Sequence, residues 1–327
     1  MFVKHAAKHY DFDISQTSEN VTMNVQAASE EPLEAVRILL AGIIDYAGLF
    51  PPSQVSMQEA VLNYATYRHS NYNWMLGRFI VPASRLEEFS EHARDFIRPD
   101  SGDPWRLSAL AGEDINATMK QVADFNRENG PGSVIDVLEV KASTMSKIEN
   151  TVKILPEGVT AYFEIAMGDK FVDLVTVLAM QGQKAKIRTG GVTSDAFPSS
   201  RDVVRFVRTC MAANVPFKAT AGLHHPVRCF RPLTYAPDAP EGTMHGFLNV
   251  LLMTAFARES YRASVLEDLM EEEFEEVFTF NLSGVSWRNE HHLTTGHLMY
   301  LRRRGMHSFG SCSFEEPIED LRKLGLL

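Results

Sequence analysis

Residues 185–221 read AKIRTGGVTSDAFPSSRDVVRFVRTCMAANVPFKATA, and this stretch decides the fold. Two short apolar segments, 185–189 and 217–221, flank a longer segment, 200–213, in which apolar side chains recur at helical spacing. A strand, a helix and a second strand in this order form the unit that joins neighbouring strands of a parallel sheet. The stretch therefore predicts two adjacent parallel strands connected by an amphipathic helix.

The same alternation of strand and helix continues in both directions along the chain. Further strands are predicted at 38–46, 78–81, 105–110, 134–141, 160–166 and 277–282, with helices at 57–68, 84–96, 114–126, 146–154 and 170–180. From the second strand to the seventh, successive strands start at the spacing that one strand, one helix and two short loops need. Residues 222–276 hold the apolar helix 244–257 and an acidic stretch at 267–276, which together predict an insertion before the eighth strand.

Two folds accommodate this order of elements. An open, doubly wound sheet would place a glycine-rich phosphate-binding turn after the first strand, but the residues there are Gly48-Leu49-Phe50-Pro51. We therefore predict an α/β fold, a (β/α)₈ TIM barrel with a helical insertion between strands seven and eight. Residues 1–32 show no strand or helix periodicity, so we expect a mobile N-terminal extension before a single barrel domain at 33–327.

Composition excludes several classes of protein. The formal charge of −10 opposes attraction to phosphates, so we expect no nucleic-acid partner. The apolar run 247–257 is too short to span a bilayer, so we expect no membrane partner. The N-terminus lacks the apolar core of a signal peptide, and three cysteines suit reduced thiols, which predicts a cytoplasmic location. The expected partners are a small-molecule substrate and further copies of the chain in a homo-oligomer.

The carboxyl ends of the strands carry the active site in barrels of this kind. Because side chains alternate across a strand, Lys186 and Arg188 share one face of the sixth strand, and Lys218 and Thr220 share that face of the seventh. Both lysines are therefore expected inside the barrel, where an ammonium group is costly unless it is paired or neutral.

Two interpretations of the lysines remain open from the residues alone. In the first, each lysine forms a salt bridge with a neighbouring carboxylate such as Glu139 or Glu164. In the second, burial and a nearby second cation lower the pKa of one lysine, which then attacks a carbonyl group and forms a Schiff base. The residues alone leave open which of the two lysines is the nucleophile in the second interpretation.

Other polar residues lie near the ends of the predicted strands or in the loops that follow. Asp136 and Glu164 are candidate catalytic residues beside Lys186 and Lys218, because a neighbouring carboxylate is able to move protons in the second interpretation. The predicted substrate-binding residues are Asp45, Glu139, Arg188, Thr189, Gly190, Gly191, Thr220, Gly222, His224 and His225. The arginine and the backbone amides of the glycines suit a phosphate or a carboxylate group.

In their order along the chain, these motifs resemble the deoxyribose-phosphate aldolase group of class I aldolases. That family has Lys-Thr-Ser-Thr-Gly on its sixth strand and Lys-Ala-Ser-Gly-Gly on its seventh. Here residues 186–190 read Lys-Ile-Arg-Thr-Gly and residues 218–222 read Lys-Ala-Thr-Ala-Gly. Ile44-Asp45-Tyr46, Asp136 in an Ile-Asp-Val context and Glu164 also match strand motifs of the family.

The resemblance implies a Schiff-base nucleophile at Lys186, an assisting lysine at Lys218 and a proton-handling acid at Asp136. Ile187 and Arg188 replace small hydroxyl residues of the family motif, so we expect a substrate other than deoxyribose phosphate. The leading hypothesis is accordingly a class I, Schiff-base aldolase-like lyase that needs neither metal nor cofactor and acts on a small anionic carbonyl compound, phosphorylated or carboxylated.

Two alternatives keep the barrel but change its function. A metal-dependent hydrolase or isomerase would use Glu139, Glu164 and His224 as ligands, with Lys186 as a base or an electrostatic clamp. A barrel without catalytic activity would serve as a binding module, and its lysines would be dispensable for function.

Overall fold

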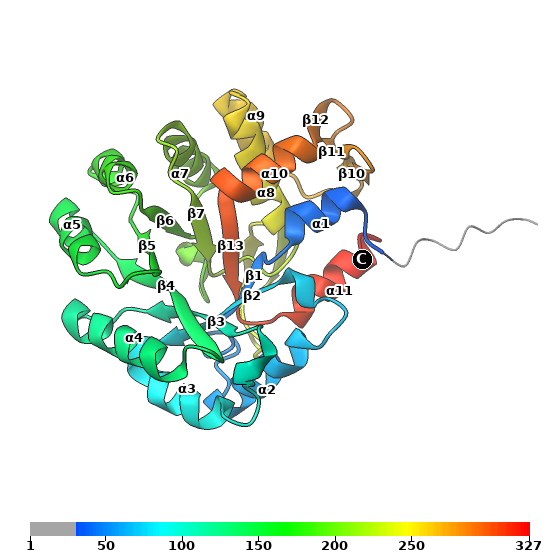
Figure 1. The fold of residues 1–327 in the computed structure, drawn as a ribbon. Coiled ribbons are helices and arrows are strands. Elements are labelled where there is room, and N and C mark those ends of the chain that lie inside the picture. Colours follow the sequence, from blue (N-terminus) through cyan, green and yellow to red (C-terminus); the bar gives the residue numbers. More distant parts are fainter. Residues whose placement is uncertain (1–30) are drawn as a thin grey trace, which may run out of the picture. The chain divides into compact units, whose positions relative to one another are not determined.

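Eight parallel strands close into a barrel in a computed structural model that describes residues 31–327 (Figure 1). Hydrogen bonds join the strands in the circular order β1, β2, β3, β4, β5, β6, β7, β13, which confirms the predicted TIM barrel. The barrel strands are β1 (Ile44–Tyr46), β2 (Leu76–Pro82), β3 (Trp105–Leu110), β4 (Ser133–Lys141), β5 (Thr160–Glu164), β6 (Lys184–Arg188), β7 (Phe217–Thr220) and β13 (Met306–Ser311). The predicted extension 1–32 lies outside the described residues, except for its last two positions.

A ring of helices surrounds the barrel, because each of the first six strands is followed by one helix that returns along its outside (Figure 1). These helices are α2 (Met57–Arg68), α3 (Leu86–Ala93), α4 (Ile115–Asn129), α5 (Met145–Lys153), α6 (Phe171–Met180) and α7 (Ser200–Ala212), and α11 (Glu315–Lys323) follows the last strand. Short 3₁₀ helices cover Asn73–Met75, Ala83–Arg85, Pro99–Ser101, Ser194–Ala196 and Glu275–Val277. Within residues 31–327, no helix has the length and the apolar character that crossing a bilayer requires.

The first strand is shorter than predicted. The predicted strand 38–46 begins inside helix α1 (Glu34–Leu40), and only Ile44–Tyr46 belongs to the barrel. Buried residues of α1 recur as Ala35, Val36, Leu39 and Leu40, which is the spacing of one helical face. The apolar run that predicted a strand is therefore the end of a helical stripe, which packs against α10 (Thr295–Arg304).

The eighth strand lies later in the chain than predicted. The predicted strand 277–282 coincides with β10 (Phe278–Asn281), which pairs antiparallel with β11 (Gly284–Trp287) outside the barrel. The strand that closes the barrel is β13, which pairs in parallel with both β1 and β7. Its sequence, Met-His-Ser-Phe-Gly-Ser, has few large apolar residues and no β-branched ones, so it lacks the composition typical of a strand.

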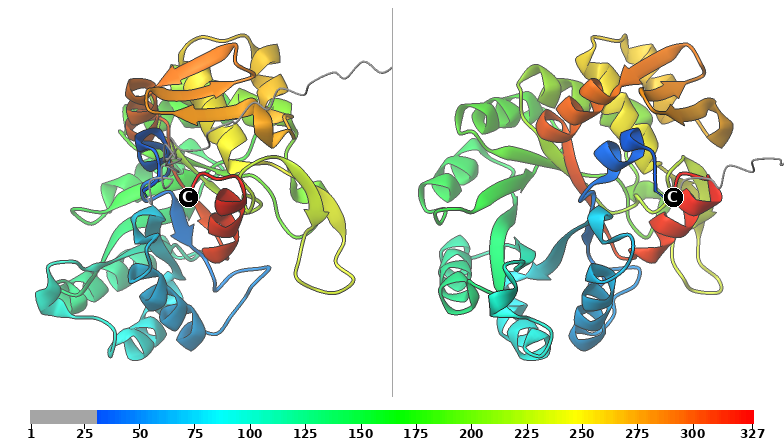
Figure 2. Two further views of the ribbon diagram at one scale, coloured as in Figure 1. Left: turned by 90° about the vertical axis from the view of Figure 1, so that its right-hand side faces the viewer. Right: turned by 45° about the vertical axis from the view of Figure 1, so that its right-hand side comes forward.

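The insertion between the seventh and eighth barrel strands consequently spans residues 221–305. Besides β10, β11 and α10, it contains the hairpin β8 (Cys229–Pro232) and β9 (Glu241–Met244), helices α8 (Phe247–Arg258) and α9 (Ala263–Met270), and strand β12 (His291–Thr294). Helix α8 packs against α7 and takes the place of the seventh barrel helix. Figure 2 shows the hairpin extending away from the barrel.

Aromatic side chains fill the space between the first strands and their helices. The fully buried ring of Phe79 lies 5.4 Å from the ring of Tyr64 and 5.2 Å from the ring of Phe89. Rings at these separations add to the free energy gained from apolar burial. The apolar core therefore lies outside the barrel wall, which leaves the inside for polar side chains.

Truncation of this cluster will destabilise the protein. We expect Phe79→Ala to lower the free energy of unfolding by about 3–5 kcal/mol, because a large buried ring leaves a cavity. Urea unfolding followed by circular dichroism measures the change. Leu62→Ala on the outer side of α2 is the control, since that side chain is 51% exposed. Equal losses in both variants would contradict this description of the core.

Candidate active site

A cavity of about 540 Å³ opens where the barrel strands end. Its lining comes from the ends of most barrel strands and from the loops that follow them, and the loop Phe50-Pro51-Pro52 forms part of one wall. The predicted site residues that line it are Glu139, Glu164, Lys186, Arg188, Gly190, Gly191, Thr220, Gly222 and His224. The cavity lies at the end of the barrel where catalytic residues of this fold are found.

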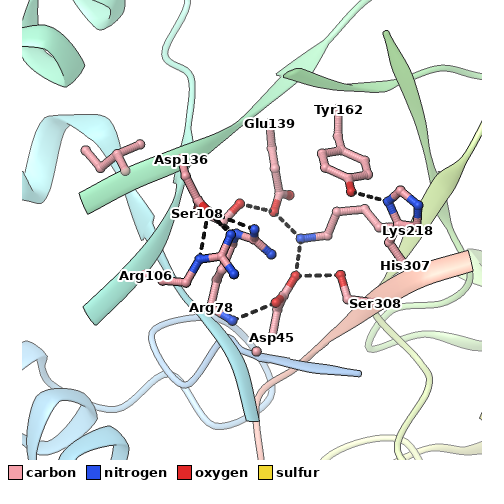
Figure 3. Close-up of polar contacts among 12 residues, drawn as sticks. Asp45, Arg78, Arg106, Ser108, Asp136, Glu139, Tyr162, Lys218, His307 and Ser308 are labelled. Carbon is pink, nitrogen blue, oxygen red and sulfur yellow. Dashed lines mark hydrogen bonds and ion pairs between the residues drawn. The ribbon is translucent and has the colours of Figure 1, made fainter. Parts of the chain in front are cut away.

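Both predicted lysines point into the barrel, and both form salt bridges. Nζ of Lys186 lies 2.6 Å from Glu139 Oε2 and 2.8 Å from Glu164 Oε2. Nζ of Lys218 lies 2.7 Å from Glu139 Oε1 and 2.5 Å from Asp45 Oδ2 (Figure 3). Glu139 thus bridges the two lysines, one with each oxygen. The first of the two interpretations from the sequence, salt bridges between the lysines and neighbouring carboxylates, is therefore present. Both ammonium groups lie beside the carboxylate of Glu139.

Burial and charge act in opposite directions on these groups. Burial disfavours ionisation of Glu139, but Lys186 and Lys218 outweigh it and hold the pKa of Glu139 far below its usual range. Burial likewise favours the neutral form of Lys218, but Asp45 and Glu139 outweigh it and raise the pKa of Lys218. Burial of Glu164 is outweighed mainly by Lys186, which lowers the pKa of Glu164. Lys218 and Glu139 therefore remain charged near neutral pH.

Hydroxyl groups complete the network below the cavity. Ser108 donates a hydrogen bond to Glu139 (2.7 Å) and Ser308 donates one to Asp45 (2.7 Å). The ring of Tyr162 lies 5.7 Å from Nζ of Lys218. Figure 3 shows these side chains converging on Lys218 from different strands. The serines were missed in the sequence, although Ser108 alternates with outward apolar residues of β3 and thereby signals an inward position.

Asp136 lies apart from the cavity, although the sequence predicts it as catalytic. Leu107 pairs with Ile135 but Ser108 pairs with Val137, so Asp136 is the extra residue of a β-bulge. Its carboxylate forms a salt bridge with Arg78 (2.6 Å) and another with Arg106 (Figure 3). Burial opposes ionisation, but the two arginines outweigh it and lower the pKa of Asp136. The structure therefore does not bring Asp136 together with Lys186.

The backbones of the loops after β6 and β7 approach each other closely at the cavity. A Cβ atom on Gly190 would lie 2.8 Å from the Cα atom of Gly222, and Gly222 has a φ of +75°. Both positions therefore require glycine. Thr189 is fully buried and donates a hydrogen bond to the carbonyl oxygen of Ala221 (2.6 Å), so its hydroxyl joins the loops and does not face the cavity.

The remaining predicted residues lie at three different depths. Asp45 is buried beneath Lys218 and does not line the cavity. Arg188 lies at the mouth, 51% exposed, with Nε 3.6 Å from Glu164 Oε1. His225 faces α11, where Nδ1 lies 2.6 Å from Asp320 Oδ2, and it does not line the cavity either.

The ligands of the metal-dependent alternative are not gathered. Glu139 and Glu164 both contact Lys186, whereas Nδ1 of His224 lies 2.9 Å from Glu316. Among residues 31–327, no group of three or more His, Cys, Asp or Glu side chains is arranged to hold a metal ion.

The chain matches no protein-family model and no curated protein sequence. Among solved structures, it matches a nitroalkane oxidase from Streptomyces ansochromogenes with 12% sequence identity and a TM-score of 0.31. That match covers 59% of this chain and 62% of the oxidase chain. A similarity of this size carries no argument about activity, so the aldolase resemblance depends on the strand motifs alone.

Removal of the Lys218 side chain will leave the buried carboxylates of Asp45 and Glu139 without the cation that they share. We expect Lys218→Met to lower the free energy of unfolding at pH 7 by about 3–5 kcal/mol. Folding lowers the pKa of Glu139, so its stabilisation is present above the pKa of an unfolded glutamate and is lost as the pH falls. Lys218→Met has less of this stabilisation to lose than the wild type. The difference in free energy of unfolding between the two proteins will therefore shrink towards acidic pH.

Urea unfolding of the wild type and of Lys218→Met between pH 4 and 8 measures the difference in their free energies of unfolding. Lys120→Met is the control, because Lys120 and Asp124 form an exposed pair on α4. We expect the control to leave stability nearly unchanged at every pH. A Lys218→Met variant as stable as the wild type at pH 7 would contradict the buried network.

Proposed function

We propose that the protein is a Schiff-base lyase of the class I aldolase type, with Lys186 as the nucleophile and a small anionic carbonyl compound as the substrate. One observation carries the proposal: Lys186 lines the cavity at the end of the barrel, yet it is only 4% exposed and lies between two carboxylates. Lys218, by contrast, does not line the cavity. Of the two buried lysines, the one that reaches the cavity is thus the one that the motif comparison implies.

Glu164 is the group that we propose for moving the proton of Lys186. Its carboxylate contacts the ammonium group directly and also lines the cavity. Transfer of one proton from Nζ to Glu164 frees the amine, which attacks the carbonyl carbon and forms a C–N bond. Glu164 then returns the proton to the carbonyl oxygen, takes a second proton from the same nitrogen and delivers it to that oxygen, which leaves as water. The product is an iminium ion in the place of the ammonium group.

Glu139 supports the same step by staying ionised. An iminium ion carries the same charge as the lysine that it replaces, so the contact with Glu139 that stabilises the ammonium group also stabilises the intermediate. Lys218 holds the second oxygen of Glu139 and thereby shares its negative charge. We propose that this sharing is how Lys218 tunes Lys186.

Cations near the cavity support an anionic substrate. Lys141 and Arg188 line the first cavity and also a second one of about 590 Å³, which adds Lys147 to its walls. Of the two acidic residues there, Glu164 already contacts Lys186, and the other is Asp195. We propose that the carbonyl group binds at Lys186 and that a carboxylate or phosphate group of the same molecule reaches these cations.

Reductive trapping tests the nucleophile. We expect 4-oxopentanoate with cyanoborohydride to leave a covalent adduct on Lys186, which peptide mapping by mass spectrometry locates. Lys186→Arg keeps the positive charge between the glutamates but cannot form an imine, so the adduct will be lost. Lys184→Arg changes another lysine of β6 and serves as the control with the adduct retained. Absence of an adduct with any ketone or aldehyde, or its location on Lys218, would refute the proposal.

A pair of matched ketones tests the anion site. 4-Oxopentanoate and 2-pentanone have the same length, but only the first has a carboxylate. We expect Lys141→Gln combined with Lys147→Gln to raise the half-saturating concentration of 4-oxopentanoate roughly tenfold, since two exposed ion pairs are lost. Trapping of 2-pentanone will not change, and neither ketone will respond to Lys153→Gln at the far end of α5. Equal effects on both ketones would contradict an anion site.

A further inference from the structure

His224 and Glu316 form a second pair of titratable groups beside the same cavity. His224 follows β7 and lines the cavity, where it is 9% exposed. Glu316 lies in the first turn of α11, and its Oε2 atom is 2.9 Å from Nδ1 of His224. Neither residue contacts the salt bridges of Lys186, so the pair is a separate unit of the site.

The contact with Glu316 determines which ring nitrogen of His224 is available. Burial disfavours ionisation of Glu316, but the hydrogen bond with His224 and the proximity of His225 outweigh it, together with the hydroxyl of Tyr235 at 3.2 Å. The pKa of Glu316 is therefore lowered, and the ionised carboxylate accepts a hydrogen bond from Nδ1–H. In the neutral ring, the other nitrogen, Nε2, then carries the lone pair that takes a proton from a bound molecule.

The neighbouring histidine provides an internal comparison. Nδ1 of His225 lies 2.6 Å from Oδ2 of Asp320, one helical turn after Glu316 on α11. Both histidine–carboxylate pairs attach the loop after β7 to the same helix, but only His224 lines the cavity. A purely structural role would make the two pairs equivalent, whereas a chemical role would belong to His224 alone.

We propose that His224, held in one tautomer by Glu316, is the acid–base group for the carbon–carbon step of the reaction. This inference rests on the proposed Schiff-base function. Nε2 takes the proton of the substrate hydroxyl, the C–O bond becomes a carbonyl, and the adjacent carbon–carbon bond breaks with its electron pair moving to the iminium nitrogen. The protonated His224 then gives its proton to the carbon of the resulting enamine. Glu316 is a positioning residue, because it does not line the cavity and reaches the bound substrate only through His224, although its other oxygen also lies 4.0 Å from Nε2 of His225.

Glu164 and His224 thus divide the proton transfers between them. Glu164 contacts Lys186 and serves the formation of the imine, whereas His224 serves the carbon of the bound substrate. Tyr235 and His225 face Glu316 from the surrounding elements, and Cys312 lies beside Tyr235. Each step has its own readout, so the two proposals can be tested separately.

Two measurements on 4-oxopentanoate separate the steps. The cyanoborohydride adduct at Lys186 reports imine formation. Exchange of the protons next to the ketone for deuterium in D₂O, followed by proton NMR, reports proton removal from carbon. We expect His224→Gln to slow the exchange by about 100-fold while the adduct still forms. We expect Glu316→Gln to slow it at least about tenfold.

The pH profile distinguishes positioning from structure. Glu316→Gln removes a negative charge beside the imidazole, so the acidic limb of the exchange profile will shift to lower pH. Asp320→Asn is the matched control, since it changes the second pair on the same helix, and we expect it to leave both rates and profile unchanged. If His224→Gln fails to fold, Glu316→Gln still tests the pair, and His224→Gln tests it if Glu316→Gln fails to fold.

Three results would overturn the inference. Normal exchange in His224→Gln, with the adduct present, would remove His224 from the chemistry and leave the proposed function intact. Equal effects of Glu316→Gln and Asp320→Asn on exchange would make the pair merely structural. An absent adduct in the wild-type protein would refute the proposed function and this inference with it.

Discussion

The carboxylate of Glu139, shared by two buried lysines, is the contact on which the rest of the site depends. The inside of this barrel carries charged side chains where many barrels of its class have layers of branched apolar ones. Ions in such a place are tolerated only when each has partners, because desolvation costs several kcal/mol per ion. Glu139 supplies one oxygen to Lys218 and one to Lys186, so a single side chain connects the fully buried lysine with the lysine that lines the cavity.

In the proposed mechanism, this contact makes residues below the cavity important for chemistry above it. Ser308 donates a hydrogen bond to Asp45, and Asp45 pairs with Lys218. Lys218 and Ser108 contact one oxygen of Glu139, and the other oxygen contacts Lys186. In the proposed mechanism, a nucleophile fixed in this way needs little reorganisation when its charge passes to an iminium ion. The proposed proton carriers, Glu164 and His224, both line the cavity.

Much of this arrangement was predictable from the sequence, because alternation along a strand assigns side chains to faces. It placed Lys186 and Lys218 inside the barrel, and nine of the predicted site residues line the cavity. Alternation is interrupted by the bulge at Asp136, and strand β13 was missed because its small residues do not signal a strand. It also missed Glu316, because no local pattern connects a residue on the last helix with His224, 92 positions earlier.

The central claim is that Lys186 is the residue that bonds to a carbonyl substrate. A crystal structure of the protein after reaction with 4-oxopentanoate and cyanoborohydride tests it most directly. We expect continuous density from Nζ of Lys186 to the former carbonyl carbon, with Glu139 still bridging to Lys218 and the carboxylate of the ligand beside Lys141 or Arg188. An unmodified Lys186, or a ligand attached to another lysine, would contradict it.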